Sequence, residues 1–214
     1  MNKKFAELLG LMAGDGCLSK YARCRMIYIA GHKIEDREYH EHVTKSLFQE
    51  IFNKEVKILE KPNEKTLFIR FSDKKIFTTL SKYLPIGRKY ERLIVPNEIL
   101  CNKNFLFAYI RGLADTDGCV IFSKQHQKYR YYPRVEITSK SKQFLLTILL
   151  KLEQEGFYGS VSHKGNESYR LEIPGPKNLK LWMNQIGFHN PKHNKKVEGY
   201  LRNPPKRPGP DLNW

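Results

Sequence analysis

The sequence is short of three features, and each shortage narrows the class of protein. No apolar run reaches the roughly 18 residues of a membrane-spanning helix, so we expect no membrane partner. Only four cysteines occur in 214 residues, without the Cys-x-x-Cys spacing of a disulfide framework or a thiolate zinc site. Acidic residues are few, 22 against 38 lysines and arginines. We therefore expect an intracellular protein, in the cytoplasm of a prokaryotic host or in an organelle.

The net charge of +16 indicates a polyanionic partner. Each phosphate that a basic side chain neutralises releases counterions, so such a surplus is typical of nucleic-acid-binding proteins. A ribosome-bound protein or a membrane-surface protein would share this charge. Hydrophobic residues make up 40% of the chain, enough to form a core in one large domain or in two small ones.

One short segment of the chain occurs twice. Residues 5–18 read FAELLGLMAGDGCL and residues 107–120 read FAYIRGLADTDGCV, with seven identities in fourteen positions. The copies lie 102 residues apart, about half the chain length, which indicates an internal duplication. Each copy supplies one carboxylate, Asp15 or Asp117, so we expect the functional centre where the copies meet.

Both halves predict the same order of elements, α-β-β-α-β-β-α. After the repeated helix of the first half, strands are expected at 17–21, 25–30, 55–60 and 66–71, and helices at 35–52 and from the cap Asp73 to Tyr83. In the second half, strands are expected at 120–124, 130–138, 158–163 and 168–173, and helices at 141–155 and 176–186. The predicted organisation is a first half at 1–95, a linker at 96–104, a second half at 105–202 and a proline-rich extended tail at 203–214.

Small residues share one face of the repeated helix. Gly10 and Gly14 of the first copy align with Gly112 and Thr116 of the second. A glycine inside a helix costs about 1 kcal/mol relative to alanine, so a packing reason is expected. If the two helices pack closely at these positions, they end side by side and bring the two aspartates together.

The aspartate pair predicts a metal site. Two neighbouring carboxylates repel each other unless a cation lies between them. Mg²⁺ is bound through one or two carboxylates, water and phosphate oxygens, which suggests metal-assisted phosphodiester cleavage, with Mn²⁺ or Ca²⁺ able to replace Mg²⁺ in binding. For a single copy, Asp-Gly would more simply be a helix stop. The second copy, the matched glycines and the basic charge weigh against that alternative.

Residues 8–16 (LLGLMAGDG) and 110–118 (IRGLADTDG) resemble the two motifs of single-chain LAGLIDADG homing endonucleases, and the order of elements resembles that family over nearly the whole chain. The resemblance implies an α+β fold of duplicated units. Two antiparallel four-stranded sheets would form a DNA-binding saddle around a central two-helix interface at Gly10 and Gly112. It also implies cleavage of DNA across the minor groove.

The resemblance assigns roles to the ends of the motifs. It implies that Asp15 and Asp117 bind the metal, with the backbone carbonyls of Gly14 and Thr116 as co-ligands. The motifs depart from the family at an often acidic position, which is Ala13 in the first copy and Asp115 in the second, and Arg111 replaces an apolar residue. Neither change affects the metal-binding aspartates, and Asp115 is expected to be a helix-end or packing residue.

The resemblance further implies a lysine or glutamine near the scissile phosphates, after the second strand of each half. Lys33 and Lys140 stand there and would polarise a phosphate or orient the attacking water, although each is equally well a solvated lysine before a helix. A two-stranded ribbon fits the major groove, so polar residues on or near the predicted strands are candidate DNA contacts. These candidates are Lys20, Arg23, Arg25, His32, Lys57, Lys61, Arg70, Arg88, Lys89, Lys124, Gln125, Lys128, Arg130, Arg134, Glu136, Thr138, Lys164, Arg170, Lys195 and Lys196.

The expected protein is a monomeric, Mg²⁺-dependent endonuclease that cuts both strands of DNA at a long site. Because the halves differ in sequence, this site should be asymmetric. The chain neither starts with Cys or Ser nor ends in His-Asn, as an intein would, so a free-standing intron-encoded product is expected. Two alternatives stay open: an RNA maturase that binds its own intron on the same fold, and a catalytically silent DNA-binding regulator. The pairs His189-Asn190 and His193-Asn194 lack the ligand spacing of a zinc site.

Overall fold

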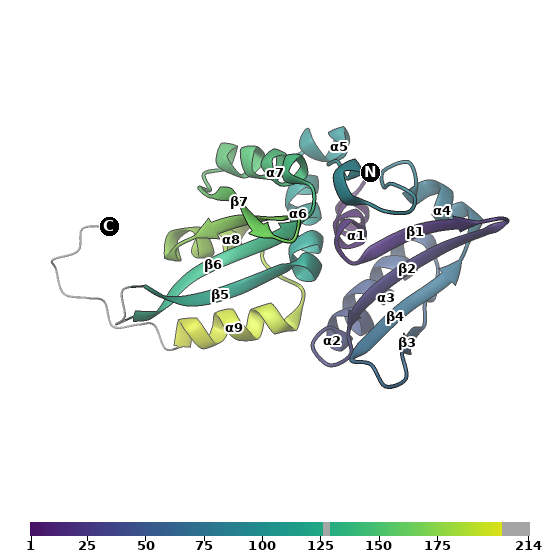
Figure 1. Ribbon diagram of the computed structural model, residues 1–214, viewed down its shortest axis with the longest axis horizontal. Helices are drawn as coiled ribbons and strands as arrows, with labels where there is room; N and C mark the ends of the chain where they lie inside the picture. The colour runs from purple at the N-terminus through teal and green to yellow at the C-terminus, as the bar shows by residue number, and fades with distance from the viewer. Residues whose placement is uncertain (126–128, 203–214) are drawn as a thin grey trace.

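The repeated segments form two helices that pack side by side between two sheets (Figure 1). The computed structural model describes residues 1–125 and 129–202, with the backbone alone described around the gap at 124–125 and 129–131. Helix α1 spans Lys3–Gly14 and helix α6 spans Lys103–Asp117. Asn2 and Asn102 start the two helices by accepting hydrogen bonds from backbone N–H groups of the first turn.

The first half contains an antiparallel sheet with the strand order β1-β2-β4-β3. Its strands are β1 (Gly16–Tyr21), β2 (Cys24–His32), β3 (Ile58–Glu60) and β4 (Thr66–Ser72). Its helices are α2 (Arg37–Tyr39), the π-helical turn η1 (His40–Thr44), α3 (Lys45–Phe52) and α4 (Lys74–Leu80). Buried Leu18, Ile27 and Ile69 alternate along the strands with less buried residues, so one face of the sheet packs against the core.

The second half repeats this topology with the strand order β5-β6-β8-β7. Its strands are β5 (Gly118–Gln125), β6 (Tyr129–Ser139), β7 (Ser160–Gly165) and β8 (Ser168–Pro174). Its helices are α7 (Lys142–Gln154), α8 (Pro176–Gln185) and α9 (Pro191–Arg202). The expected α+β fold with two antiparallel four-stranded sheets is therefore confirmed.

A single apolar cluster runs through both halves by way of α1 and α6. Leu8, Leu9, Ile110 and Leu113 on these helices are almost completely buried. Burying one such side chain contributes about 1.5–3 kcal/mol, so separating the halves would expose a large part of the core. The two central helices are therefore held in a fixed relation.

Several elements differ from the sequence-based expectation. The helix expected at 35–52 begins at Arg37 and contains the π-helical turn, where the buried His40 side chain hydrogen-bonds Thr44. Asp73 does cap α4, but that helix ends at Leu80, and β3 and β7 start later than expected.

Three helical elements were not expected: a 3-10 turn, η2 (Tyr90–Arg92), the short helix α5 (Asn97–Leu100) and α9. The predicted extended tail at 203–214 lies outside the described residues. Among the described helices, none has the length and apolar character needed to cross a membrane.

Candidate metal centre and nucleic-acid interface

The two central helices touch through their glycines. A β-carbon added at Gly10 would overlap the carbonyl oxygen of Tyr109, and one added at Gly112 would overlap the carbonyl oxygen of Glu7. Both contacts are related by the same sequence offset as the repeat, so the interface has pseudo-two-fold symmetry. The backbones approach as closely as they do because neither glycine has a side chain.

This contact places the two motif aspartates together. Asp15 is the C-cap of α1 and Asp117 is the last residue of α6, and a β-carbon on Gly14 would lie 3.4 Å from the Asp117 carboxyl carbon. Burial away from water, and next to it the negative charge of Asp117, raises the pKa of Asp15 to about 7. Burial also raises the pKa of Asp117. A helix C-terminus disfavours negative charge as well, so this pair favours a cation beside it.

The Lys89 ammonium supplies one positive charge at the end of α1. It donates to the carbonyl oxygens of Ala13 at 2.7 Å and Met12 at 3.3 Å, and also to that of Gly14. Its charge opposes the rise in the pKa of both aspartates. The carbonyls at the end of α1 thus face a positive charge. With the two carboxylates they form an all-oxygen donor set that fits Mg²⁺ once Lys89 leaves the Gly14 carbonyl.

Thr116, the counterpart of Gly14, turns its side chain back onto its own helix. Its hydroxyl donates to the carbonyl oxygens of Gly112 at 3.1 Å and Leu113 at 3.0 Å. This hydroxyl is thus engaged by its own helix, and it lies against Gly14 of α1. Any contribution of Thr116 to a metal would therefore come from its backbone carbonyl.

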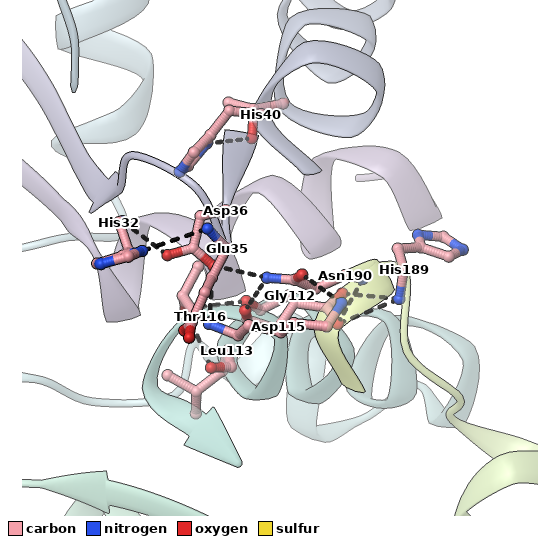
Figure 2. Close-up of polar contacts among 12 residues, drawn as sticks. His32, Glu35, Asp36, His40, Gly112, Leu113, Asp115, Thr116, His189 and Asn190 are labelled. Carbon is pink, nitrogen blue, oxygen red and sulfur yellow. Dashed lines mark hydrogen bonds and ion pairs between the residues drawn. The ribbon is translucent and has the colours of Figure 1, made fainter. Parts of the chain in front are cut away.

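A second lysine, in the other half of the chain, also acts on the charge of the aspartates. Lys192, at the start of α9, lies 2.7 Å from Oδ1 of Asp36, and its charge also opposes the rise in the pKa of Asp15 and Asp117. Asn190 bridges Asp36 and Asp115 (Figure 2). Burial would raise the pKa of Asp36, but its hydrogen bonds, first of all from Lys192, lower it overall.

Asp36, Lys192 and Asn190 were not predicted as site residues. Asp36 reads in the sequence as part of an ordinary helix start. Asn190 lies in a His-Asn pair that was considered only as a zinc motif. The sequence offers one indication for Lys192, which is that it lies close in the chain to the predicted DNA contacts Lys195 and Lys196. Their meeting depends on packing between segments more than 150 residues apart, which no local pattern encodes.

Two charged residues of the second motif, Asp115 and Arg111, form structural contacts. Asp115 is fully buried and accepts the backbone N–H groups of His189 and Asn190, which oppose the rise in its pKa to about 7 that burial causes. Arg111 forms an ion pair with the buried Glu7 at 2.8 Å, and Glu7 also contacts His189 at 2.5 Å. These partners satisfy the acidic groups, so the cluster cross-links α1, α6 and the segment before α9.

The two lysines predicted near the scissile phosphates both contact other side chains of the protein. Lys33 forms an ion pair with Glu60 of β3, and the Lys140 ammonium lies 4.7 Å from the ring centre of Tyr90. Lys89, predicted as a DNA contact, lies at the end of α1, where Asp15 follows.

On the second sheet, the predicted polar face carries a network of charges. Glu172 forms ion pairs with two arginines, at 3.3 Å from Arg134 and 3.4 Å from Arg170. Arg170 also lies 3.4 Å from a carboxylate oxygen of Glu136. Glu136 is only 2% exposed although it lies on the face opposite the core. Both arginines are therefore held in place, and DNA would meet a preformed pattern of charges. Lys164 donates to the Thr138 hydroxyl at 3.1 Å on the same face.

The first sheet presents a different surface. The Arg70 guanidinium lies 5.7 Å from the ring centre of Phe68, which stacks on Tyr28. Lys20 and Arg25 pair across β1 and β2. They share the strand alternation of Leu18 and Ile27, so they lie on the core side of the sheet, near the hairpin end.

The remaining candidates are scattered around the sheets. Three make local contacts with the chain: His32 with the Glu35 N–H, Lys61 with Glu64, and Arg88 with Tyr90. Lys195 pairs with Glu38 of the other half. Exposed positions are held by Arg23, Lys57 and Lys196. The side chains of Lys124, Gln125 and Arg130, and all of Lys128, lie outside the described residues.

Comparisons with known proteins agree with this fold. Residues 104–187 match the model of the LAGLIDADG-like domain. The homing endonuclease I-DmoI in complex with DNA and Ca has a TM-score of 0.64 at 20% identity, covering 92% of this chain and 97% of that one. The homing endonuclease I-WcaI bound to its DNA recognition sequence has a TM-score of 0.63 at 16% identity, covering 91% and 85%. At these identities the likeness shows the fold.

Two curated proteins match over most of this chain. The replicative DNA helicase DnaB of Synechocystis sp. is 27% identical over 203 residues, which are 87% of this chain and 22% of the relative. The replication factor C small subunit of Methanocaldococcus jannaschii is 24% identical over 202 residues, which are 92% of this chain and 10% of the relative. The chain thus spans about a fifth and a tenth of the length of these relatives.

Proposed function

We propose that this chain, which carries a LAGLIDADG-like domain and has the fold of the single-chain homing endonucleases I-DmoI and I-WcaI, is a metal-dependent DNA endonuclease. It would hydrolyse both strands of a long, asymmetric site. The observation that carries the proposal is the placement of Asp15 and Asp117 at the ends of two tightly packed helices, between two sheets. DNA-bound structures of the same fold support the choice of substrate.

Asp15 and Asp117, with the carbonyls of Gly14 and Thr116, would hold the metal. When bound, Mg²⁺ would stabilise negative charge that develops on the phosphate and lower the pKa of a coordinated water. The donors are oxygens, which suit Mg²⁺. The raised pKa values of the two carboxyls indicate negative charge that the protein alone does not compensate, and a divalent cation would compensate it.

The protein's own groups would bind and orient the DNA. Lys89 and Lys192 bring positive charge to the aspartates from the first and the second half, where each would attract a phosphate of the cleaved region. The charged network of the second sheet and the aromatic surface around Arg70 on the first sheet would engage different flanks of the site. Because the two sheets present different surfaces, the two ends of the DNA site would differ in sequence and the target would be asymmetric.

The test begins with duplexes selected for binding from a randomised DNA library in Ca²⁺. Cleavage of a selected duplex is then measured in Mg²⁺ for the wild type, Asp15→Asn and Asp117→Asn. We expect each variant to cut at least about a hundredfold more slowly. Binding in Ca²⁺ should stay within about tenfold of the wild type, because most affinity comes from contacts to phosphate.

Three outcomes would contradict the proposal. Full cutting by either variant would exclude the shared centre. Selective binding by the wild type without cleavage in Mg²⁺ or Mn²⁺ would indicate a DNA-binding regulator. Preference for a structured intron RNA over every selected duplex would indicate a maturase.

A further inference from the structure

We propose that Asp36 is a positioning residue that fixes the Lys192 ammonium between the two halves, near the end of α6 that carries Asp117, and that it thereby sets the rate at which one of the two DNA strands is cut. The inference rests on the proposed nuclease function. Its structural part, the capture of Lys192 by Asp36 across the two halves, can be tested without any cleavage.

Asp36 is fixed by three donors. Its Oδ1 accepts from Lys192 Nζ at 2.7 Å and from Asn190 Nδ2 at 2.9 Å, and its Oδ2 accepts from the His32 backbone N–H at 2.8 Å. The residue is 7% exposed. Charge-assisted hydrogen bonds are short and directional, and a buried carboxylate with one partner removed leaves an uncompensated charge. The position of the Lys192 ammonium is therefore tied to this carboxylate.

Asn190 connects the same carboxylate to the central helix. Its side-chain amide donates both to Asp36 and to the Asp115 carbonyl at 2.9 Å, and its backbone N–H donates to the Asp115 carboxylate at 3.0 Å. Asn190 and Asp115 are fully buried. Figure 2 shows this chain of contacts from the start of α2 to the last turn of α6. Asp115 lies two residues before Asp117, so Asp36 is fixed relative to the metal-binding end of α6.

The two lysines that act on the charge of the aspartates are held by different chemistry. Lys89 donates to backbone carbonyls at the end of α1, whereas Lys192 is held by a carboxylate of the opposite half. The Lys192 side chain keeps 20% of its surface exposed, so it remains available to a phosphate. A change at Asp36 would therefore disturb Lys192 and leave the carbonyl contacts of Lys89 in place.

The substitution Asp36→Asn removes the charge with little change in shape, and its amide oxygen still accepts a hydrogen bond. Cleavage of a selected duplex labelled on either strand is compared among the wild type, Asp36→Asn, Lys192→Met and the double variant. We expect both single variants to slow the same strand about tenfold and the double variant to be no slower, because groups that act through one another are not additive. A nicked intermediate should accumulate.

Glu38→Gln is the matched control. It removes another ion pair between the halves, Lys195–Glu38 at 3.3 Å, in which both side chains are exposed. We expect unchanged rates on both strands. Equal slowing of both strands by Asp36→Asn, or additive slowing in the double variant, would show that Asp36 only cross-links the halves. If Asp36→Asn does not fold, Lys192→Met gives the strand test alone.

A measurement on the free protein separates this inference from the nuclease proposal. In ¹⁵N-lysine NMR, the Lys192 ammonium should give a slowly exchanging signal in the wild type that is lost in Asp36→Asn and kept in Glu38→Gln. Loss of the signal in the control, or its absence in the wild type, would overturn the inference even if DNA is cut. A wild type that shows the signal but cuts no selected duplex would overturn the nuclease proposal and the rate claim, and leave the capture of Lys192 standing.

Discussion

At the scale of single residues, the two motif aspartates occupy positions that weaken the fold. Each lies at the end of a helix whose dipole disfavours negative charge, and each faces the other. Lys89 and Lys192 offset only part of this, since the pKa of both carboxyls stays raised. Such placement is typical of functional groups, whose arrangement serves a ligand more than stability.

Stability without metal should therefore fall as the pH rises. The pKa of Asp15 is about 7 in the folded chain against 3.8 ordinarily, so between these values the folded state binds more protons than the unfolded state. Asp15→Asn removes the part of this dependence that Asp15 contributes, while the raised pKa values of Asp115 and Asp117 keep the rest. In EDTA at pH 8 we expect its Tm to exceed that of the wild type by about 2–4 °C, the shift that corresponds to ~1 kcal/mol at this size.

Thermal melts from pH 3 to 8 check the sign of this effect. Below about pH 4 the carboxyl is protonated in both states, so the two proteins should melt nearly alike. Mg²⁺ should raise the Tm of the wild type more than that of Asp15→Asn. A variant that melts below the wild type at pH 8 would mean that the Asp15 charge stabilises the metal-free fold.

At the scale of elements, the helices and strands with a regular spacing of apolar residues were predicted best. The two repeated helices, the eight strands and the helices α7 and α8 were found within a few residues, because alternating apolar residues and N-caps such as Asp73 and Ser141 act locally. Helix α9 was missed because its sequence is mostly polar and contains Gly199. Its order comes from packing, with His193 and Val197 buried and Tyr200 stacked on Phe122.

The candidate site also combines residues that the local sequence marks with residues that only the packing of distant segments brings together. The aspartates and glycines were visible in the sequence because the repeat marks them. The capture of Lys192 by Asp36 was not, since it depends on where α9 folds back. The π-helical turn was also unpredictable, as its hydrogen bonding depends on how buried His40 fits beside Gly31. The assigned roles of the individual basic residues stay predictions.

The glycine contact between α1 and α6 leads to a prediction about these elements. Gly10→Ala should lower the free energy of unfolding by about 1–3 kcal/mol, because its methyl group would meet the Tyr109 carbonyl. Cleavage should fall further than stability explains, since the aspartates move apart. Chemical denaturation and single-turnover cleavage measure the two effects.

Gly199→Ala is the control for helix propensity. Gly199 lies inside α9 and an added β-carbon would meet no atom within 4 Å. This variant should be stabilised by up to about 1 kcal/mol, the difference in propensity. If Gly10→Ala behaves in the same way, the two helices do not need their close approach.

At the scale of the whole molecule, the excess of positive charge is the property that most affects DNA binding. A net charge of +16 on 214 residues is expected to make DNA binding strongly salt-dependent. We predict that log Kd against log salt concentration has a slope of several units, corresponding to about 0.9 per phosphate contacted. Fluorescence anisotropy with a selected and a scrambled duplex measures it. A slope near one for the selected duplex would show that few phosphates are contacted and would contradict binding along both sheets.

The symmetric glycine contact also bears on how such a protein diversifies. The seam between α1 and α6 consists of matched backbone surfaces. The two sheets carry different side chains, with Arg70 beside stacked aromatic rings on the first and Arg134 and Arg170 paired with Glu172 on the second. A half taken from another chain with the same seam would fit beside either half of this one and bring a foreign sheet with it. Recombination at the segment between the halves would then generate new combinations of recognition surfaces in one step, without rebuilding the centre.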